Sequence, residues 1–393
     1  MSSALLTLPA LIDPHVHFRV PGGEHKEDWR TGAAAAIAGG VTTVLDMPNN
    51  NPACTTKERL EEKKRLIDAQ LAEVGIPLRY GLYLGASEKT VSEIENARGG
   101  YIGIKVFLGQ STGDLLMDND TAFEEVCHTA ARLGTIVAVH AEDEKIMQNL
   151  KASLSPESLT NVRVHSRIRG REAAITAMKK AIALGKKYGT KLYILHASTK
   201  EEVALIRQAK HDGVTIALET TPHHLFLNES AYETLGTKAQ MNPPLRTPED
   251  QAALWEGLMD GTIDTIGTDH APHTLEEKGQ PYGKAPSGVP GIETLLPLLL
   301  TAVRDGKLTL DRFMAVTRTN AEKFFDLPSN DDTVVVDMNT VRPVRGSTFK
   351  TKCGWSPFEG WELVGWPAYT VLRGKKVEST TASRRGPAKG GRK

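Results

Sequence analysis

Leu11-Ile12-Asp13-Pro14-His15-Val16-His17 is an apolar run that ends in two histidines. On an extended strand, side chains at positions i and i+2 project from the same face. His15 and His17 therefore offer two imidazoles side by side, a ligand pair that suits a borderline divalent ion such as zinc. Most pairs at this spacing are incidental, so the surrounding sequence has to decide whether this one begins a metal site.

Short apolar or β-branched runs alternate with longer Ala-, Glu- and Lys-rich stretches along most of the chain, which is typical of parallel βαβ units. The helical stretches include 28–38, 57–73, 171–187 and 200–210. The eight predicted strands are 11–18, 41–47, 78–84, 102–107, 136–141, 191–196, 214–220 and 262–268. Eight such units fit a (β/α)8 barrel, and a doubly wound open sheet fits the count as well.

Polar side chains at the ends of these strands separate the two folds. They are His15, His17, Asn49, Lys105, His140, His196, Glu219 and Asp269. In a barrel all the carboxyl ends of the strands meet on one face, where the active site lies, whereas an open sheet spreads them along an edge. The sequence therefore predicts an α/β fold with a TIM-like barrel.

The periodic pattern stops after Phe325. Residues 334–337 and 368–372 read as short strands, which predicts a small β appendage formed mainly by the C-terminal segment. We expect residues 1–328 to form the barrel, 329–377 the appendage, and 378–393 a disordered basic tail.

Composition narrows the possible functions. Lys+Arg and Asp+Glu balance at 48 each, so no overall field attracts nucleic acid or an anionic membrane. The three cysteines (Cys54, Cys127 and Cys353) are few and far apart, which favours a reducing, cytoplasmic location over a disulfide framework. The apolar N-terminus lacks a basic leader region and reads as an entering strand.

Three further clusters strengthen the metal prediction: Val139-His140-Ala141-Glu142, Leu195-His196-Ala197-Ser198 and the stretch 267–273, GTDHAPH. Lys105 interrupts an apolar strand, where an unpaired ammonium is costly. It either pairs with a buried carboxylate or reacts with CO2 to form a carbamate, an anionic ligand able to bridge two metals. The sequence predicts the second case, with His15, His17 and Asp269 on one Zn2+ and His140 and His196 on the other.

The motifs HVHFR, MPN, IKVFL, VHAED, LHAST, ETTPHHL, DHAPHTLEEK and PGIETLLPLLLTAV follow one another in this order between His15 and Val303. Together they resemble the amidohydrolase superfamily. Within it they most resemble the dihydroorotases, including the dihydroorotase domain of the large eukaryotic pyrimidine-synthesis polypeptide and bacterial relatives. The resemblance implies zinc-dependent, reversible cyclisation of N-carbamoyl-L-aspartate to L-dihydroorotate in pyrimidine (UMP) biosynthesis, with Asp269 as the general base.

Substrate choice depends on residues outside the metal set. Arg19 lies two residues beyond His17 on the same strand face, which suits bidentate capture of the ring carboxylate of dihydroorotate. The resemblance implies that Asn49 and His273 assist Arg19. It also implies that Asn242 and the backbone near Pro290 and Gly291 touch the ring.

Two features are secondary. The small, polar, glycine-flanked segment 109–114 has the composition of a mobile lid that closes through Ser111 or Thr112, or of an ordinary βα loop. Glu219, His223 and His224 are either extra metal ligands or groups that orient the ligands.

The alternatives are another cyclic amidohydrolase (a hydantoinase, dihydropyrimidinase or allantoinase) and a non-catalytic dihydroorotase-like scaffold. Arg19 and Asn49 argue against the first, and the complete set of expected ligands argues against the second. The expected partners are the small-molecule substrate, a second copy of the chain in a homodimer and, where one is required, an aspartate transcarbamoylase.

Overall fold

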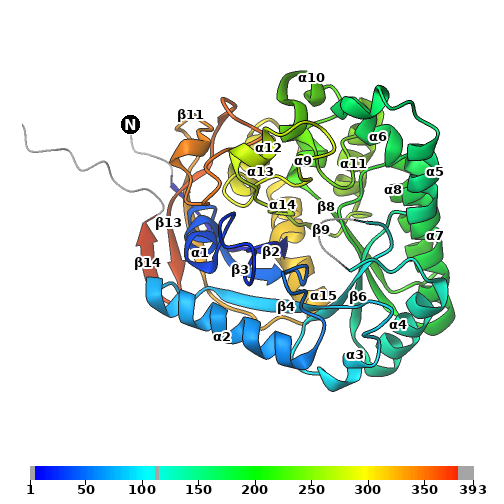
Figure 1. Cartoon of the computed structure of the whole chain (residues 1–393). Coiled ribbons are helices and arrows are strands. Elements are labelled where there is room, and N and C mark those ends of the chain that lie inside the picture. Colours follow the sequence, from blue (N-terminus) through cyan, green and yellow to red (C-terminus); the bar gives the residue numbers. More distant parts are fainter. Residues whose placement is uncertain (1–4, 111–114, 379–393) are drawn as a thin grey trace, which may run out of the picture.

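A computed structural model describes residues 5–110 and 115–378, and eight parallel strands form its centre (Figure 1). The strands follow one another around the sheet in chain order, β2 to β9. They are β2 (Leu11–Val16), β3 (Val41–Asp46), β4 (Arg79–Gly85), β5 (Gly103–Phe107), β6 (Ile136–His140), β7 (Lys191–Ile194), β8 (Ile216–Thr220) and β9 (Thr265–Ile266).

The two ends of this sheet meet. Val16, at the end of β2, forms a parallel bridge with His270, which lies just beyond β9. The backbone N–H of His17 donates to the carbonyl of His270 at 2.9 Å. The predicted (β/α)8 barrel is therefore confirmed, and the open-sheet alternative is wrong.

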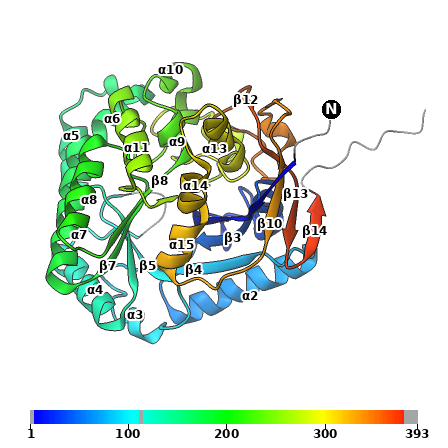
Figure 2. The same ribbon diagram turned by 180° about the vertical axis from the view of Figure 1, so that it is seen from behind.

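Helices surround the barrel on its outside (Figures 1 and 2). Those that follow the first seven strands are α1 (Trp29–Ala38), α2 (Lys57–Val74), α3 (Glu93–Asn96), α4 (Asp120–Leu133), α5 (Glu144–Ala152), α6 (His165–Ile168), α7 (Arg171–Tyr188) and α8 (Lys200–His211). Later in the chain come α9 (Pro222–Phe226), α10 (Ala231–Leu235), α11 (Pro248–Asp260), α12 (Leu275–Lys278), α13 (Leu295–Arg304), α14 (Leu310–Met314) and α15 (Asn320–Phe325).

Local sequence explains where these helices begin and end. In α8, Thr199 accepts from the N–H of Glu202 and the Glu202 side chain returns the bond, a reciprocal cap. In α2, Thr56 caps the first turn and Gly75 ends the helix in the left-handed conformation. The four helices predicted at 28–38, 57–73, 171–187 and 200–210 are confirmed within a residue or two.

Side-chain alternation along the strands divides the core into two layers. Large side chains such as Tyr83 and Tyr193 fill the barrel interior, and Phe325 from α15 packs against them. A larger apolar layer lies between the strands and the surrounding helices. On β6, the alternate residues Ile136, Ala138 and His140 point to the same side of the strand, toward the barrel interior. The first two belong to the apolar core, and the third, at the carboxyl end, lines the cavity.

A four-stranded antiparallel sheet packs beside the barrel in the order β1-β10-β13-β14. Its strands are β1 (Leu5–Pro9), β10 (Thr333–Asp337), β13 (Trp366–Leu372) and β14 (Lys375–Glu378), and a small pair, β11 (Arg342–Pro343) and β12 (Glu362–Leu363), lies nearby. Three of the four strands come from the C-terminal segment, as predicted. The sequence placed β1 with the barrel, whereas it pairs with β10 (Figure 2).

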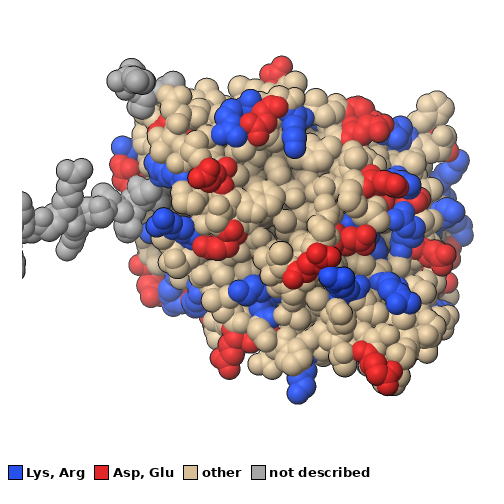
Figure 3. Space-filling model, turned by 90° about the horizontal axis from the view of Figure 1, so that it is seen from above, with Lys and Arg blue, Asp and Glu red and all other residues tan. Residues whose placement is uncertain are grey.

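The structure also bears on the predicted C-terminal tail and on the charge of the surface. Glu378 ends β14 and so is not part of a tail, while residues 379–393 lie outside the described part of the chain. Basic and acidic side chains are interspersed over the face shown in Figure 3, in keeping with the balanced composition. Among the described helices, none combines the length and hydropathy needed to cross a membrane.

Candidate active site

The carboxyl ends of the barrel strands surround a narrow cavity that opens to solvent. Nine residues predicted from the sequence line it: His15, His17, Arg19, Asn49, Lys105, His140, His196, Asn242 and Asp269. Four further lining residues were not predicted: Phe107, Ala271, Ser287 and Gly288. Residues separated by more than 250 positions in the sequence thus share one small, polar chamber.

His15, His17 and Asp269 form the first donor cluster. Asp269 Oδ1 lies 3.3 Å from His15 Nε2 and 3.0 Å from His17 Nε2. All three side chains are buried, and one ligand atom from each falls within 4.8 Å of the others. Burial lowers the pKa of His17 to about 3, so its imidazole is neutral and available as a ligand.

His140 and His196 form the second donor pair. Nδ1 of His140 lies 3.0 Å from Nε2 of His196, and the His196 ring stands 5.4 Å from that of His15. Burial lowers the pKa of both rings, so they too are held neutral. The two clusters therefore adjoin each other across the mouth of the barrel.

Lys105 is buried in the same cavity. Its Nζ lies 4.4 Å from the centre of the Phe107 ring, and among the described residues no acceptor forms a hydrogen bond with it. Burial lowers the pKa of Lys105 to about 7, although Asp269 and Glu219 act in the opposite direction. A large part of the amine is therefore uncharged near neutral pH, and the uncharged amine is the form that reacts with CO2.

The donor chemistry fits a metal centre. Four imidazoles and one carboxylate converge with a buried amine, and imidazole nitrogen with carboxylate oxygen is a ligand set that zinc accepts. Nδ1 of His196 is buried without a hydrogen-bond partner among the described residues. The predicted metal ligands are thus brought together from five different strand ends.

Glu219 supports the cluster from below. Its Oε1 accepts from Nδ1 of His15 at 2.8 Å and from the backbone N–H of His196 at 3.1 Å, while Oε2 accepts from the Tyr193 hydroxyl at 2.8 Å. A Cβ at position 267 would collide with this carboxylate, which explains why Gly267 stands there. Of the two roles considered for Glu219, these contacts match the group that orients ligands.

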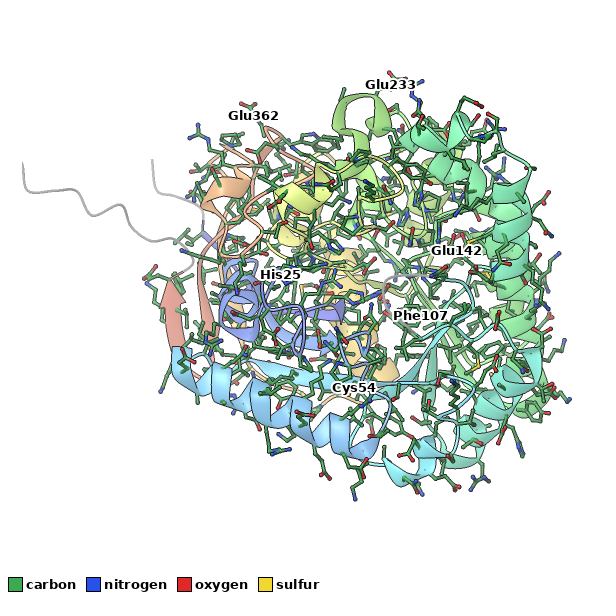
Figure 4. The ribbon with its side chains drawn as sticks, viewed as in Figure 1. His25, Cys54, Phe107, Glu142, Glu233 and Glu362 are labelled. Atoms are coloured by element: carbon green, nitrogen blue, oxygen red, sulfur yellow. The ribbon has the colours of Figure 1, made fainter. Side chains whose placement is uncertain are left out.

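Glu142 and Arg169 play a similar part beside His140. Glu142 Oε2 lies 2.9 Å from His140 Nε2 and 3.0 Å from Arg169 Nε. Burial alone would raise the pKa of Glu142, but Arg169 and His140 hold it well below its usual range. Figure 4 shows Glu142 and Phe107 near the middle of the molecule, whereas Glu233 and Glu362 lie at its outer margin.

The opposite wall carries the residues expected to hold substrate. Nε of Arg19 donates to the carbonyl of Pro272 at 3.3 Å, and its NH2 group lies 3.2 Å from Nε2 of His273. His273 does not line the cavity and instead lies behind Arg19. Burial lowers the pKa of Arg19 only to about 10, so the guanidinium remains charged.

Gly288 brings backbone close to this wall. Its φ is +132°, and a Cβ there would lie 2.7 Å from the carbonyl oxygen of Ala271. The predicted backbone contact at Pro290 and Gly291 lies just outside the lining. The N–H of Gly291 donates to Nδ1 of His270 at 3.1 Å instead.

The other predicted residues lie around the cavity or beyond the described part of the chain. His224 is bonded to the Thr221 hydroxyl at 2.8 Å and lies 3.1 Å from the carbonyl of Pro243. Nε2 of the adjacent His223 is buried with no hydrogen-bond partner among the residues described. Ser111 and Thr112, the candidate lid residues, fall outside the described residues.

Three site residues adopt an unusual backbone conformation. Arg19, His196 and Asp269 have φ values of 62°, 38° and 44°, in the left-handed region that non-glycine residues rarely occupy. Each lies two or three residues beyond the end of its barrel strand, where the chain leaves the sheet and the side chain lines the cavity. Such conformations persist when the surrounding structure enforces them, and they concentrate at functional sites.

The comparisons with known proteins agree with this geometry. Residues 6–331 match the sequence profile of the amidohydrolase family. The chain is 39% identical over 389 residues to a dihydroorotase of Methanosarcina mazei, covering 95% of this chain and 83% of that protein. It is also 39% identical over 376 residues to the multifunctional protein CAD of Squalus acanthias, covering 95% of this chain and 15% of that one.

Among solved structures, an L-hydantoinase (dihydropyrimidinase) from Arthrobacter aurescens superposes with a TM-score of 0.89 at 28% identity. The match covers 95% of this chain and 86% of that one. The barrel fold, the residues at its strand ends and the similar proteins all indicate the family that the sequence motifs suggested. The chain belongs to the amidohydrolase family and, within it, to the dihydroorotases.

Proposed function

We propose that this protein is a zinc-dependent dihydroorotase that interconverts N-carbamoyl-L-aspartate and L-dihydroorotate in pyrimidine biosynthesis. The observation that carries the proposal is the position of Arg19. Its charged guanidinium lines the same cavity as the His/Asp donor cluster. A cyclic amide that carries a carboxylate is the substrate class that such a pairing selects.

The ligand set supports two zinc ions. His15, His17 and Asp269 would hold one ion and His140 and His196 the other, with a carbamate on Lys105 between them. Zinc bound there would polarise the amide carbonyl and lower the pKa of water near it.

Asp269 is suited to proton transfer. Burial alone would raise its pKa, but the neighbouring His15 and His17 hold that pKa well below its usual range. The carboxylate is therefore ionised at neutral pH and can accept a proton from the attacking water. When the ring amide breaks, Asp269 returns the proton to the leaving nitrogen, and ring closure follows the reverse order.

Arg19 and Asn49 would bind the substrate carboxylate, and Asn242 would contact the ring. His273 would act on the substrate through Arg19, since it lies behind that side chain. The cavity wall at Ser287 and Gly288 offers the nearby backbone that was expected at Pro290 and Gly291.

A hydantoinase activity is the second candidate, because the solved structures that superpose well include hydantoinases. Arg19 argues against it, since a hydantoin ring has no carboxylate to pair with the guanidinium. We also propose a cytoplasmic homodimer that can act beside an aspartate transcarbamoylase. Three free, buried cysteines are in keeping with a reducing compartment.

A spectrophotometric assay of the zinc-loaded protein with dihydroorotate, hydantoin and allantoin tests the substrate. We expect turnover of dihydroorotate alone. Turnover of hydantoin or allantoin without dihydroorotate would overturn the assignment. A protein that stays metal-free after growth in zinc-replete medium would indicate a non-catalytic scaffold.

A further inference from the structure

Asn242, at the edge of the cavity, is connected to the buried His165 and, through it, to the partly buried Tyr282. Nε2 of His165 lies 3.0 Å from the carbonyl oxygen of Met241 and 3.0 Å from Oδ1 of Asn242. Nδ1 of the same ring lies 3.1 Å from the Tyr282 hydroxyl. The imidazole is only 5% exposed, so these contacts account for both of its nitrogens.

The contacts fix which nitrogen of His165 carries the proton. A backbone carbonyl can only accept a hydrogen bond, so Nε2 must be the donor to Met241. Burial and the nearby Arg169 lower the pKa of His165 to about 4, which leaves the ring neutral at physiological pH. Nδ1 is then unprotonated and accepts from the hydroxyl of Tyr282.

This tautomer in turn fixes the Asn242 amide. An atom that faces the Nε2 proton must be an acceptor, so Asn242 turns its oxygen to His165 and its NH2 group away from it. Asn242 lines the cavity, and no acceptor for its NH2 group is found within the described ranges 5–110 and 115–378.

We infer that His165 and Tyr282 are specificity-determining positioning residues, which hold Asn242 so that it donates a hydrogen bond to the uncleaved ring carbonyl of the substrate. This inference rests on the proposed function. A site polarised in this way favours a strong acceptor such as a urea oxygen and disfavours a donor or a weak acceptor at the same place.

Steady-state kinetics of the zinc-loaded enzyme test the inference. We compare dihydroorotate with its 2-thio analogue, in which sulfur, a weaker acceptor, replaces the uncleaved oxygen. His165→Phe removes the donor to Asn242, and we expect the preference of kcat/KM for oxygen over sulfur to fall about tenfold, chiefly through KM. His165→Gln, whose amide can still donate to Oδ1, is expected to keep most of that preference.

Tyr282→Phe and Tyr232→Phe form a matched pair. Both remove a tyrosine hydroxyl, but that of Tyr232 contacts Ser166 and Leu245 and not His165. We expect Tyr282→Phe to weaken the oxygen preference and Tyr232→Phe to leave it at the wild-type value. An unchanged preference in both His165→Phe and Tyr282→Phe would overturn the inference.

A second measurement does not depend on the substrate. Two-bond 1H–15N spectra of 15N-histidine-labelled holoenzyme report the tautomer of each ring, and His165→Gln identifies the signals of His165. We expect a protonated Nε2 and an unprotonated Nδ1, and the reverse pattern would overturn the inference. Failure of the wild type to turn over dihydroorotate would count against the proposed function. The tautomer of His165 would still test whether His165 orients Asn242, because that measurement needs no substrate.

Discussion

Lys63 and Asp46 form a buried ion pair close to the strand ends that carry Arg19 and Asn49. Replacing Lys63 tests how much this pair contributes to stability and to substrate binding. The two side chains are 1% and 0% exposed, and Nζ lies 2.5 Å from Oδ2. Nζ also donates to the carbonyl of Met47 and to Oδ1 of Asn50, both at 2.8 Å. The other Asp46 oxygen accepts from the N–H of Phe18 at 2.8 Å. The pair therefore joins α2 to the strand ends that carry Arg19 and Asn49.

Lys63→Met fills a similar volume but leaves the Asp46 carboxylate buried without its cation. Breaking a buried pair in this way costs about 3–5 kcal/mol, because the remaining charge loses its compensation and has no access to water. We expect a loss of that size in the free energy of unfolding. The KM for dihydroorotate should rise more than kcat falls, since the disturbed strand ends carry Arg19 and Asn49, which we propose bind the substrate carboxylate.

Denaturant unfolding followed by far-ultraviolet circular dichroism measures the loss, and steady-state kinetics measure KM and kcat. Lys64→Met is the matched control, because Lys64 is 62% exposed in its pair with Asp68 and exposed pairs contribute at most about 1 kcal/mol. Lys63→Met/Asp46→Asn removes the orphaned charge and should recover part of the stability. A loss below about 1 kcal/mol in Lys63→Met, or a double variant no more stable than the single one, would refute the reasoning.

Three further substitutions test other parts of the site and the fold. Arg19→Met removes the charge that we propose faces the substrate carboxylate. We expect kcat/KM for dihydroorotate to fall by about 10- to 150-fold through KM, the equivalent of a lost charged hydrogen bond. An unchanged KM would count against carboxylate capture by Arg19. Asp269→Ala should retain metal by elemental analysis and lower kcat by about 10²- to 10⁴-fold, and near-normal turnover would exclude Asp269 from proton transfer. Burial raises the pKa of Glu293 from 4.5 to about 8, although it accepts from the N–H groups of Lys350 and Thr351. The folded state thus holds that proton more tightly than the unfolded chain, and wild type should lose stability relative to Glu293→Gln as pH rises from about 4.5 to 8; parallel stability curves over this window would contradict the assignment.

The barrel and the clustering of its strand-end side chains were predictable because two local signals coincide. Runs such as residues 136–141 are apolar enough to read as buried strands, and most of them carry a residue with ligand chemistry near or just beyond the carboxyl end. Parallel strands bring their carboxyl ends to one face, so a local pattern along the sequence becomes a three-dimensional cluster. Lys105 was detectable for the same reason, since a cation inside an apolar strand requires an explanation.

The rest of the site depends on contacts that leave no periodic signal. Ser287 and Gly288 lie in an irregular segment, and contacts distant in the sequence hold it at the cavity: the N–H of Gly288 donates to the Gln240 carbonyl at 3.0 Å, and the N–H of Ala271 donates to the carbonyl of Val289 at 2.9 Å. His273 carries the expected chemistry, but Arg19 stands between it and the cavity. The pairing of β1 with β10 joins residues more than 320 positions apart, and an isolated five-residue strand gives no indication of its partner.

The left-handed conformations of Arg19, His196 and Asp269 bear on how this protein can be improved. Such a conformation costs a non-glycine residue roughly 1–2 kcal/mol, and glycine adopts it without that cost. Glycine at any of the three positions would remove the conformational strain of the backbone, and it would also remove a side chain from the cavity. Selection of variants for thermal tolerance alone would therefore reward the loss of function at these three positions, and a library built for stability should hold them constant.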